Sequence, residues 1–395
     1  MQPNDVILVA GDTSPHSPFT TANYIADYLL MCQPLPGVQV LQLGQDREGL
    51  ERFMKRIESD CAPYRPTVAL IYHGVEEVNG KNPVGNFLHH KLYVAKTIAD
   101  LKKIGVRTII VGSANCVDSF YYNNNPAEAA FCNKNLAILR DVDKPIVEKE
   151  GVPFADIYQL MSDIMPKAKA AFGEKYAFVG TDGIHPGSNG QLIIAYAFLK
   201  SLGCGGAIGT LTVDLAAKKA EGTAGQKILS FENNTVELES TRYPFCFFGE
   251  PANPESSSGI IQFFPFNEDL NRYMLVVKGL AAAKAKVTWG TESRDFAADD
   301  LAKGVNLAAA FAAHTPFDTQ FRKVNSAVRD QQEHEPYLCE TVFHNLGVFR
   351  KLAPDHPDAV DGLARAALQQ NKTKADKAAA LVIPVRCTLK IEAIP

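Results

Sequence analysis

The stretch DVILVAGDTS (residues 5–14) joins a short apolar run to a Gly-Asp turn. Four more runs of this kind follow in the first half of the chain: VQVLQLG (38–44), TVALIYHG (67–74), RTIIVGS (107–113) and PFADIY (153–158). Each is almost continuously apolar, which is typical of strands that are covered on both faces. The sequence therefore predicts five buried strands.

Helical patterns separate these runs. Residues 20–31 (TTANYIADYLLM) repeat apolar side chains at a spacing of three and four, and residues 92–105 (LYVAKTIADLKKIG) end in lysines and a glycine that suits a helix C-terminus. The alternation predicts an α/β fold, a three-layer flavodoxin-like parallel sheet with helices on both faces. Ligands bind beyond the carboxyl ends of strands in such sheets. The chemistry is therefore expected after Ala10, Leu43, Tyr72 and Gly112.

The pattern changes after about residue 205. Residues 206–310 alternate apolar and polar side chains between Gly, Pro and Asn, which predicts a small antiparallel β-rich domain. Residues 311–395 are Ala-rich and helical, and PVRCTLKIEAI near the end is expected to form a closing strand. We thus expect an α/β domain over 1–205 with a C-terminal extension. The aromatic runs RYPFCFFG and IIQFFPF fit the core of the β-rich domain better than a platform for stacking sugars.

Composition narrows the classes of partner. The 395-residue chain is 46% hydrophobic and 21% charged with a formal net charge of −4, so charge gives no reason to expect nucleic acid or an anionic membrane. The eight cysteines lack a C-x-x-C pair, which favours reduced, buried thiols over zinc sites or a disulfide framework. The N-terminal residues lack a leader pattern, and no apolar window is long enough for a membrane helix. We expect a cytoplasmic protein, or a secreted or periplasmic one if a signal peptide has been trimmed.

The segment GTDGIHPGSNGQLIIAYAFLKSLG (180–203) carries the most specific motif. Asp182 and His185, three residues apart before an amphipathic helix, resemble the last block of the SGNH/GDSL hydrolase family. The resemblance covers roughly residues 5–203 and extends to bacterial esterases of this family with a C-terminal addition. It implies that His185 is a general base and that Asp182 orients its ring. The alternative is that Asp182 is a turn residue and His185 caps the helix that begins near Ser188.

The first block departs from the family pattern. In the family the nucleophilic serine follows Gly-Asp, whereas here Asp12 is followed by Thr13 and then Ser14. The methyl group of a threonine restricts its rotamers and crowds the attack. Ser14 can take the role only if the loop is remodelled by one residue, and Pro15 narrows that option. Both Thr13 and Ser14 therefore remain candidate nucleophiles.

The two oxyanion blocks are also altered. The family glycine after the second strand corresponds to Gly44, or to Gln45 in its place, so a backbone N–H donor can remain there. The family's Gly-x-Asn reads Gly74-Val75-Glu76. An ionised Glu76 cannot donate a hydrogen bond to the oxyanion, and losing such a donor costs about 3–4 kcal/mol. The alternative is that Glu76 and Glu77 have no catalytic role and are a solvated pair that begins the next helix.

Two hypotheses follow. In the first, the protein hydrolyses short acyl esters such as acetyl groups on carbohydrate, with a small-molecule or carbohydrate ester as its partner and no metal or organic cofactor. In the second, it is a degenerate relative that binds a carbohydrate or protein partner without turnover. A weaker idea is a divalent metal held by carboxylates and imidazoles at the sheet edge. Its ligands would come from Asp12, His16, His73, Glu76, Glu77 and His185. The oligomeric state stays open.

Overall fold

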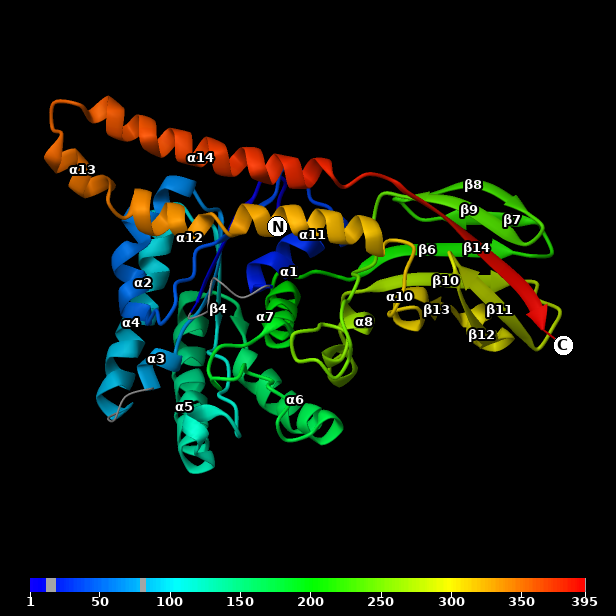
Figure 1. The fold of residues 1–395 in the computed structure, drawn as a ribbon, viewed down its shortest axis with the longest axis horizontal. Coiled ribbons are helices and arrows are strands. Elements are labelled where there is room, and N and C mark those ends of the chain that lie inside the picture. The colour runs from blue at the N-terminus through cyan, green and yellow to red at the C-terminus, as the bar shows by residue number, and fades with distance from the viewer. Residues whose placement is uncertain (12–18, 79–82, 395) are drawn as a thin grey trace.

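The computed structural model describes residues 1–11, 19–78 and 83–394. Its N-terminal sheet has five parallel strands in the order β2-β1-β3-β4-β5, which is the flavodoxin-like order and confirms the predicted fold class (Figure 1). The strands are β1 (Val6–Gly11), β2 (Gln39–Gln42), β3 (Val68–Tyr72), β4 (Thr108–Gly112) and β5 (Phe154–Ala155). The last strand is shorter than expected because Asp156 caps the following helix, its side chain accepting from the backbone N–H of Gln159 at 3.2 Å.

Helices cover both faces of this sheet. They are α1 (Thr21–Asp27), α2 (Leu50–Arg56), α3 (Val75–Val78), α4 (Pro83–Lys103), α5 (Pro126–Glu150), α6 (Ile157–Phe172) and α7 (Ser188–Ser201). Alternate strand residues point to opposite faces, so Val68 and Leu70 pack with α1, α6 and α7, whereas Ala69 and Ile71 pack with α2, α4 and α5. This division explains why the strands read as continuous apolar runs.

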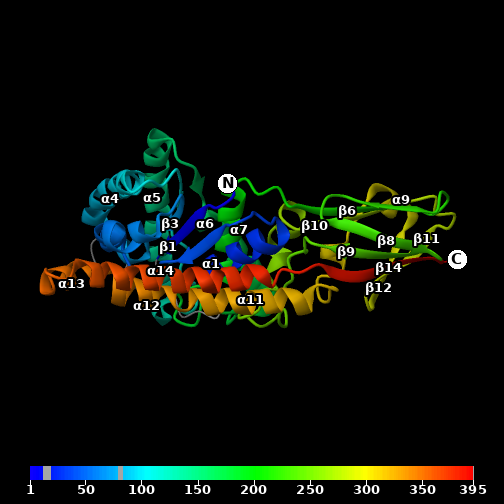
Figure 2. The same ribbon diagram turned by 90° about the horizontal axis from the view of Figure 1, so that it is seen from above.

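The C-terminal half contains two further sheets, seen on the right in Figures 1 and 2. Their orders are β13-β10-β6-β7 and β12-β11-β14-β9-β8. The strands are β6 (Ala207–Asp214), β7 (Lys219–Gly222), β8 (Gln226–Glu232), β9 (Thr235–Ser240), β10 (Arg272–Lys278), β11 (Lys284–Trp289), β12 (Glu292–Ala297), β13 (Val305–Asn306) and β14 (Val385–Ile394). The expectation of a purely antiparallel arrangement is wrong, because β6 and β10 pair in parallel. The chain between β6 and β10 forms β8 and β9 of the other sheet. It then re-enters the first sheet as β10, which runs parallel to β6.

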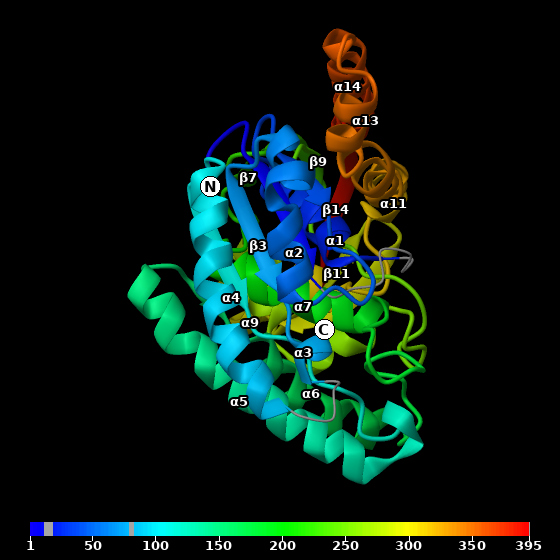
Figure 3. The same ribbon diagram turned by 90° about the vertical axis from the view of Figure 1, so that its left-hand side faces the viewer.

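Helices of the C-terminal half reach back to the parallel sheet. They are α8 (Phe266–Asp269), α9 (Ala298–Lys303), α10 (Leu307–Ala310), α11 (Asp318–Gln332), α12 (Glu335–Tyr337), α13 (Leu346–Leu352) and α14 (Pro357–Ala380). Helices α11 and α14 run side by side between the C-terminal sheets and the α12–α13 segment (Figures 1 and 2). Figure 3 shows α13 and α14 projecting beyond the parallel sheet. The last strand, β14, lies between β11 and β9.

Short π-helical and 3₁₀ segments complete the chain. They are Tyr28–Cys32, Ile57–Cys61, Ala62–Tyr64, Tyr122–Asn124, Ile260–Phe263 and Leu338–Phe343. All eight cysteines are buried as free thiols. Within the described ranges, no helix is both long and apolar enough to cross a membrane.

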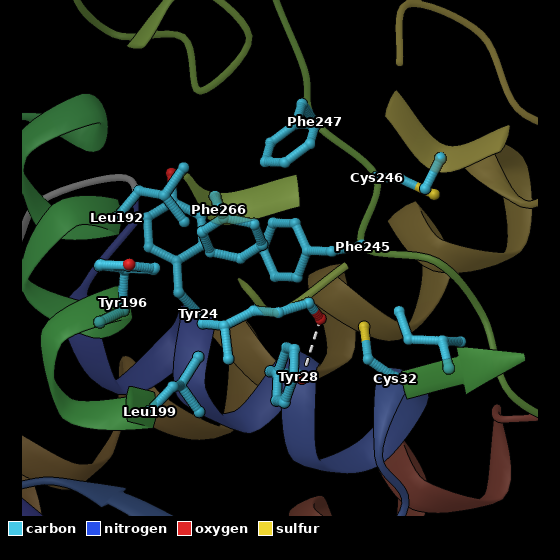
Figure 4. Close-up of a cluster of buried hydrophobic side chains, with 14 of the residues drawn as sticks. Tyr24, Tyr28, Cys32, Leu192, Tyr196, Leu199, Phe245, Cys246, Phe247 and Phe266 are labelled. Atoms are coloured by element: carbon cyan, nitrogen blue, oxygen red, sulfur yellow. Dashed lines mark hydrogen bonds between the residues drawn. The ribbon is translucent and has the colours of Figure 1, made fainter. Parts of the chain in front are cut away.

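The aromatic runs of the C-terminal half extend beyond the β-rich core in which they were expected. Phe245, Phe247 and Phe266 pack against Tyr24 of α1 and Tyr196 of α7 (Figure 4). They join the two halves of the protein rather than filling only the β-rich part. A hydrogen bond reinforces this junction, since the Tyr28 hydroxyl donates to the backbone carbonyl of Leu270 at 2.9 Å.

Candidate functional site

A tight turn before α7 holds the Asp-His motif. The Oδ1 atom of Asp182 accepts hydrogen bonds from the backbone N–H groups of Ile184 at 2.9 Å and His185 at 3.0 Å. Gly183 has φ +77°, and a Cβ atom there would lie 2.4 Å from the backbone nitrogen of Tyr122. Only glycine adopts this conformation freely and allows that approach. The D-G-I-H spacing therefore fixes the direction of both functional side chains.

Within this turn, the imidazole and the carboxylate face each other. His185 Nδ1 lies 2.6 Å from Asp182 Oδ2. Partial burial by itself raises the pKa of Asp182. The hydrogen bonds from the His185 ring and from the two backbone N–H groups outweigh this effect and lower the pKa to about 2. The carboxylate is thus ionised at neutral pH and requires the proton on Nδ1, which leaves Nε2 as the basic nitrogen of the neutral ring.

The Nε2 side of the ring meets a second carboxylate. Asp46 Oδ1 lies 3.3 Å from His185 Nε2, and the Asp46 side chain is 54% exposed. Sequence reasoning did not single out Asp46, although it lies in the loop directly after β2, where the sheet rule places functional groups. The ring is therefore held between two acidic side chains.

The loop after β4 forms hydrogen bonds with the Asp182–His185 turn. The Asn115 amide donates to the carbonyl of Ile184 at 3.0 Å, and the backbone N–H of Asp118 donates to the carbonyl of Gly183 at 2.9 Å. Loops after β2 and β4 thus both contact the Asp182–His185 turn, which lies at the carboxyl ends of the parallel strands. This is the edge of the parallel sheet at which the sequence predicts the functional residues.

A buried ion pair organises the loop after β2. The Arg56 guanidinium contacts both carboxylate oxygens of Glu48 at 2.5 Å and donates to the carbonyl of Leu43 at 2.5 Å. Burial raises the pKa of Glu48, but Arg56 and His73 lower it below its usual range. The pair fixes the backbone on both sides of buried Gly44 and half-buried Gln45, the candidates for the first oxyanion donor.

His73, one of the imidazoles considered for a metal, belongs to this ion-pair cluster. Its Nε2 atom lies 3.7 Å from Glu48 Oε2, and its ring stacks on Phe53 at a centroid distance of 5.0 Å. Across the residues described, no three His, Cys, Asp or Glu side chains come together in a way that could hold a metal ion. Asp12 and His16, also named for that site, lie outside the described residues.

The segment after β3 brings two glutamates to the site edge. Gly74 is buried with φ +149°, and a Cβ atom there would lie 2.9 Å from the Cβ of Ala114. Glu77 Oε1 accepts the backbone N–H of Leu50 at 2.6 Å and thereby caps α2, whose own N-cap is Gly49. Glu77 is thus a cap supplied by another segment rather than a solvated residue.

Glu76 lines a cleft of about 380 Å³ beside α3. The same cleft is lined by Arg47 and Arg52, whose positive charges can offset the charge of a carboxylate. Glu76 is half-buried. Its side chain therefore lines an open, mixed-charge cleft.

The C-terminal half contributes one carboxylate to the site. Glu255 Oε2 accepts from the backbone N–H of Ser188 at 3.3 Å and from its hydroxyl at 3.1 Å, at the N-terminus of α7. The N-cap residue is Gly187, and a Cβ atom there would lie 2.6 Å from Glu255 Oε1. Since α7 begins three residues after His185, this contact anchors the Asp182–His185 turn. No local sequence signal points to a partner 67 residues away.

The candidate nucleophiles Thr13 and Ser14 lie outside the described residues, as does Asp12. They remain predictions from the sequence. The described geometry contains the Asp182–His185 pair and the loops that hold it.

Comparison with known proteins adds to this description. No family model matches the chain, and no curated protein matches it. Among solved structures, BT4096, a gut microbial diltiazem-metabolizing enzyme, is similar over 100% of this chain and 98% of its own, with a TM-score of 0.75 at 18% identity.

Two shorter structures are also similar. A catalytic mutant of Axe2, an acetylxylan esterase from Geobacillus stearothermophilus, covers 51% of this chain at 17% identity and TM-score 0.42, with 96% of its own chain covered. LAE5, an alpha/beta hydrolase enzyme from the metagenome of Lake Arreo, covers 52% at 15% identity and TM-score 0.41, with 97% of its own chain covered. The likeness to BT4096 over the whole chain shows that the two proteins share the α/β fold together with its C-terminal extension.

Proposed function

We propose that this protein is an ester hydrolase that removes short acyl groups, such as acetyl, from carbohydrate. The observation that carries the proposal is the 2.6 Å contact between His185 Nδ1 and Asp182 Oδ2, at the carboxyl edge of the parallel sheet. An ionised carboxylate that holds an imidazole in one tautomer is the arrangement that a general base needs. The resemblance to SGNH/GDSL hydrolases assigns the same two residues this role.

The proposed reaction runs through an acyl-enzyme. The hydroxyl of Thr13 or Ser14 attacks the ester carbonyl while His185 Nε2 takes its proton, and the protonated ring then gives that proton to the departing alcohol. Water, activated by the same nitrogen, cleaves the acyl-enzyme and releases the acid. Backbone N–H groups near Gly44 and Gln45 are the proposed oxyanion donors.

A second candidate function is binding without turnover. The observation that favours it is Asp46, whose carboxylate lies 3.3 Å from the nitrogen that must accept the nucleophile's proton. Glu76 adds a negative charge at the position of the family's asparagine donor. In this alternative, the altered cleft retains a carbohydrate ligand but does not cleave it.

Hydrolysis of p-nitrophenyl acetate and of an acetylated xylo-oligosaccharide separates the two functions. We expect the wild type to release acetate, and we expect His185→Ala and one of Thr13→Ala or Ser14→Ala to lose about a thousandfold or more in kcat. His356→Ala, an exposed histidine at the start of α14, is the matched control. If the wild type hydrolyses both substrates no faster than heat-treated protein does, the ester hydrolase function is rejected and binding without turnover remains.

A further inference from the structure

A second pocket lies between α1, the segment 245–249 and α11. Its volume is about 330 Å³, which is within the range of small-molecule sites. Six of its thirteen lining residues are aromatic: Phe19, Tyr24, Phe245, Phe247, Phe248 and Phe321. Phe19 and Phe248 stack with their centroids 4.1 Å apart at the half-buried rim. We call this the Asp27 pocket, after the acid that lines it.

Asp27 is a buried acid of this pocket whose hydrogen bonds the described residues satisfy only in part. Its side chain is fully buried, and its Oδ2 atom accepts from the Asn325 amide at 2.5 Å. Its Oδ1 atom has no hydrogen-bond partner among the described residues. A buried carboxyl oxygen without a hydrogen-bond partner is unfavourable, so a ligand that supplies one would be stabilised here.

Positive charge lies at the same pocket. Arg322 and Arg329 both line it, and the Arg329 guanidinium lies 4.8 Å above the Phe19 ring and 3.9 Å from Glu333. The pocket therefore presents a buried acid inside and two guanidinium groups on α11. It also contains Ser326 and Asn325, which add a hydroxyl and an amide.

These groups discriminate between ligand classes. An organic cation would interact favourably with Asp27 and the aromatic rings but would be repelled by the two arginines. An anion would interact favourably with the arginines but would be repelled by the buried carboxylate of Asp27. A hydroxyl is both donor and acceptor, so it matches Asp27 whether the acid is ionised or protonated. The C–H face of a sugar ring suits the aromatic wall.

We propose that the Asp27 pocket binds one neutral sugar ring, with Asp27 and the α11 side chains contacting its hydroxyls and Phe248 contacting its face. The pocket adjoins the candidate site through α7, because the Tyr24 hydroxyl donates to the carbonyl of Ser188 at 3.1 Å. Phe248 also pairs with Ser257 in the loop that carries Glu255. The inference rests on the proposed function for its choice of carbohydrate, but binding here requires no turnover.

The test is direct binding by titration calorimetry and saturation-transfer NMR. The probes are xylobiose, cellobiose and N,N′-diacetylchitobiose, with benzylamine as a cation and benzoate as an anion, each at about 10 mM, well above a Kd of about 1 mM. The proteins are the wild type, Asp27→Asn, Phe248→Ala and His185→Ala. Phe131→Ala, an exposed phenylalanine on α5, is the matched control for Phe248→Ala.

We expect at least one disaccharide to bind the wild type, Phe131→Ala and His185→Ala equally, and to bind Phe248→Ala and Asp27→Asn at least about tenfold more weakly. Circular dichroism checks that both pocket variants are folded, and Phe248 at the rim keeps the test decisive if Asp27→Asn unfolds. Binding of benzylamine or benzoate in place of sugars, sugar binding that survives Phe248→Ala, or no binding of any disaccharide would overturn the proposal. Sugar binding by a protein that hydrolyses no ester would remove the proposed function and leave this one standing.

Discussion

Asp46 Oδ1 and His185 Nε2 lie 3.3 Å apart, on the side of the imidazole that faces away from Asp182. An exposed pair of this kind is worth about 0–1 kcal/mol, which corresponds to at most about fivefold in rate. Asp46→Asn frees Nε2 for a nucleophile, so we expect kcat/KM for p-nitrophenyl acetate to rise by about twofold to fivefold. Asp163→Asn, on α6, is the control. A loss of activity in Asp46→Asn would instead assign Asp46 a part in proton transfer.

Substitution of Glu76 is expected to increase the rate of ester hydrolysis. Glu76→Asn replaces a carboxylate with an amide that can donate to an oxyanion, and one such donor is worth about a hundredfold or more in kcat. Because the loops here are adapted to glutamate, we expect at least a tenfold rise in kcat for p-nitrophenyl acetate. Glu58→Gln, which removes an exposed charge from the π-helical turn after α2, should leave kcat unchanged. An unchanged rate in Glu76→Asn would mean that position 76 does not face the oxyanion.

Glu255 ties the C-terminal half to the candidate site. It caps α7 in place of Gly187, so Glu255→Ala should lower the free energy of unfolding by about 1 kcal/mol. The Asp182–His185 turn precedes the same helix, so kcat should also fall several-fold. Glu250→Ala changes an exposed residue of the same loop and serves as the control in urea unfolding and ester hydrolysis. Equal stability of the two variants would contradict the capping role.

Glu335 should make stability depend on pH. This α12 residue accepts the backbone N–H of Gln42 at 2.6 Å at the edge of the parallel sheet, and burial raises its pKa from 4.5 to about 7 despite the hydrogen bonds that lower it. The folded protein therefore binds this proton more tightly than the unfolded chain does. Its favourable contribution is complete below pH 4.5 and is lost as pH rises through 7.

Urea unfolding at pH 5 and pH 8 measures the effect. The two pKa values correspond to a loss of about 2–3 kcal/mol between these pH values from this group. Glu335→Gln removes that part of the pH dependence, whereas Glu340→Gln, an exposed glutamate nearby, keeps it. Parallel pH profiles for the wild type and Glu335→Gln would show that the carboxyl group stays ionised.

The sequence alone determined the parallel sheet and the Asp182–His185 pair. Apolar runs such as residues 68–72, rich in β-branched and aliphatic residues, indicate strands with two covered faces, and the D-G-I-H turn is closed by local hydrogen bonds to the Asp182 side chain. Both depend on neighbours within a few residues, so the pattern of residue types contains them.

Only the tertiary structure placed Asp46 beside His185, Glu77 and Glu255 at helices whose N-caps are glycines, and Glu335 at the sheet edge. It also moved the aromatic run around Phe245 from an expected β-rich core to the junction with α1 and α7. These contacts join segments far apart in the chain. A side chain's partner across such a distance is set by how the layers pack, and a linear pattern carries no record of that packing.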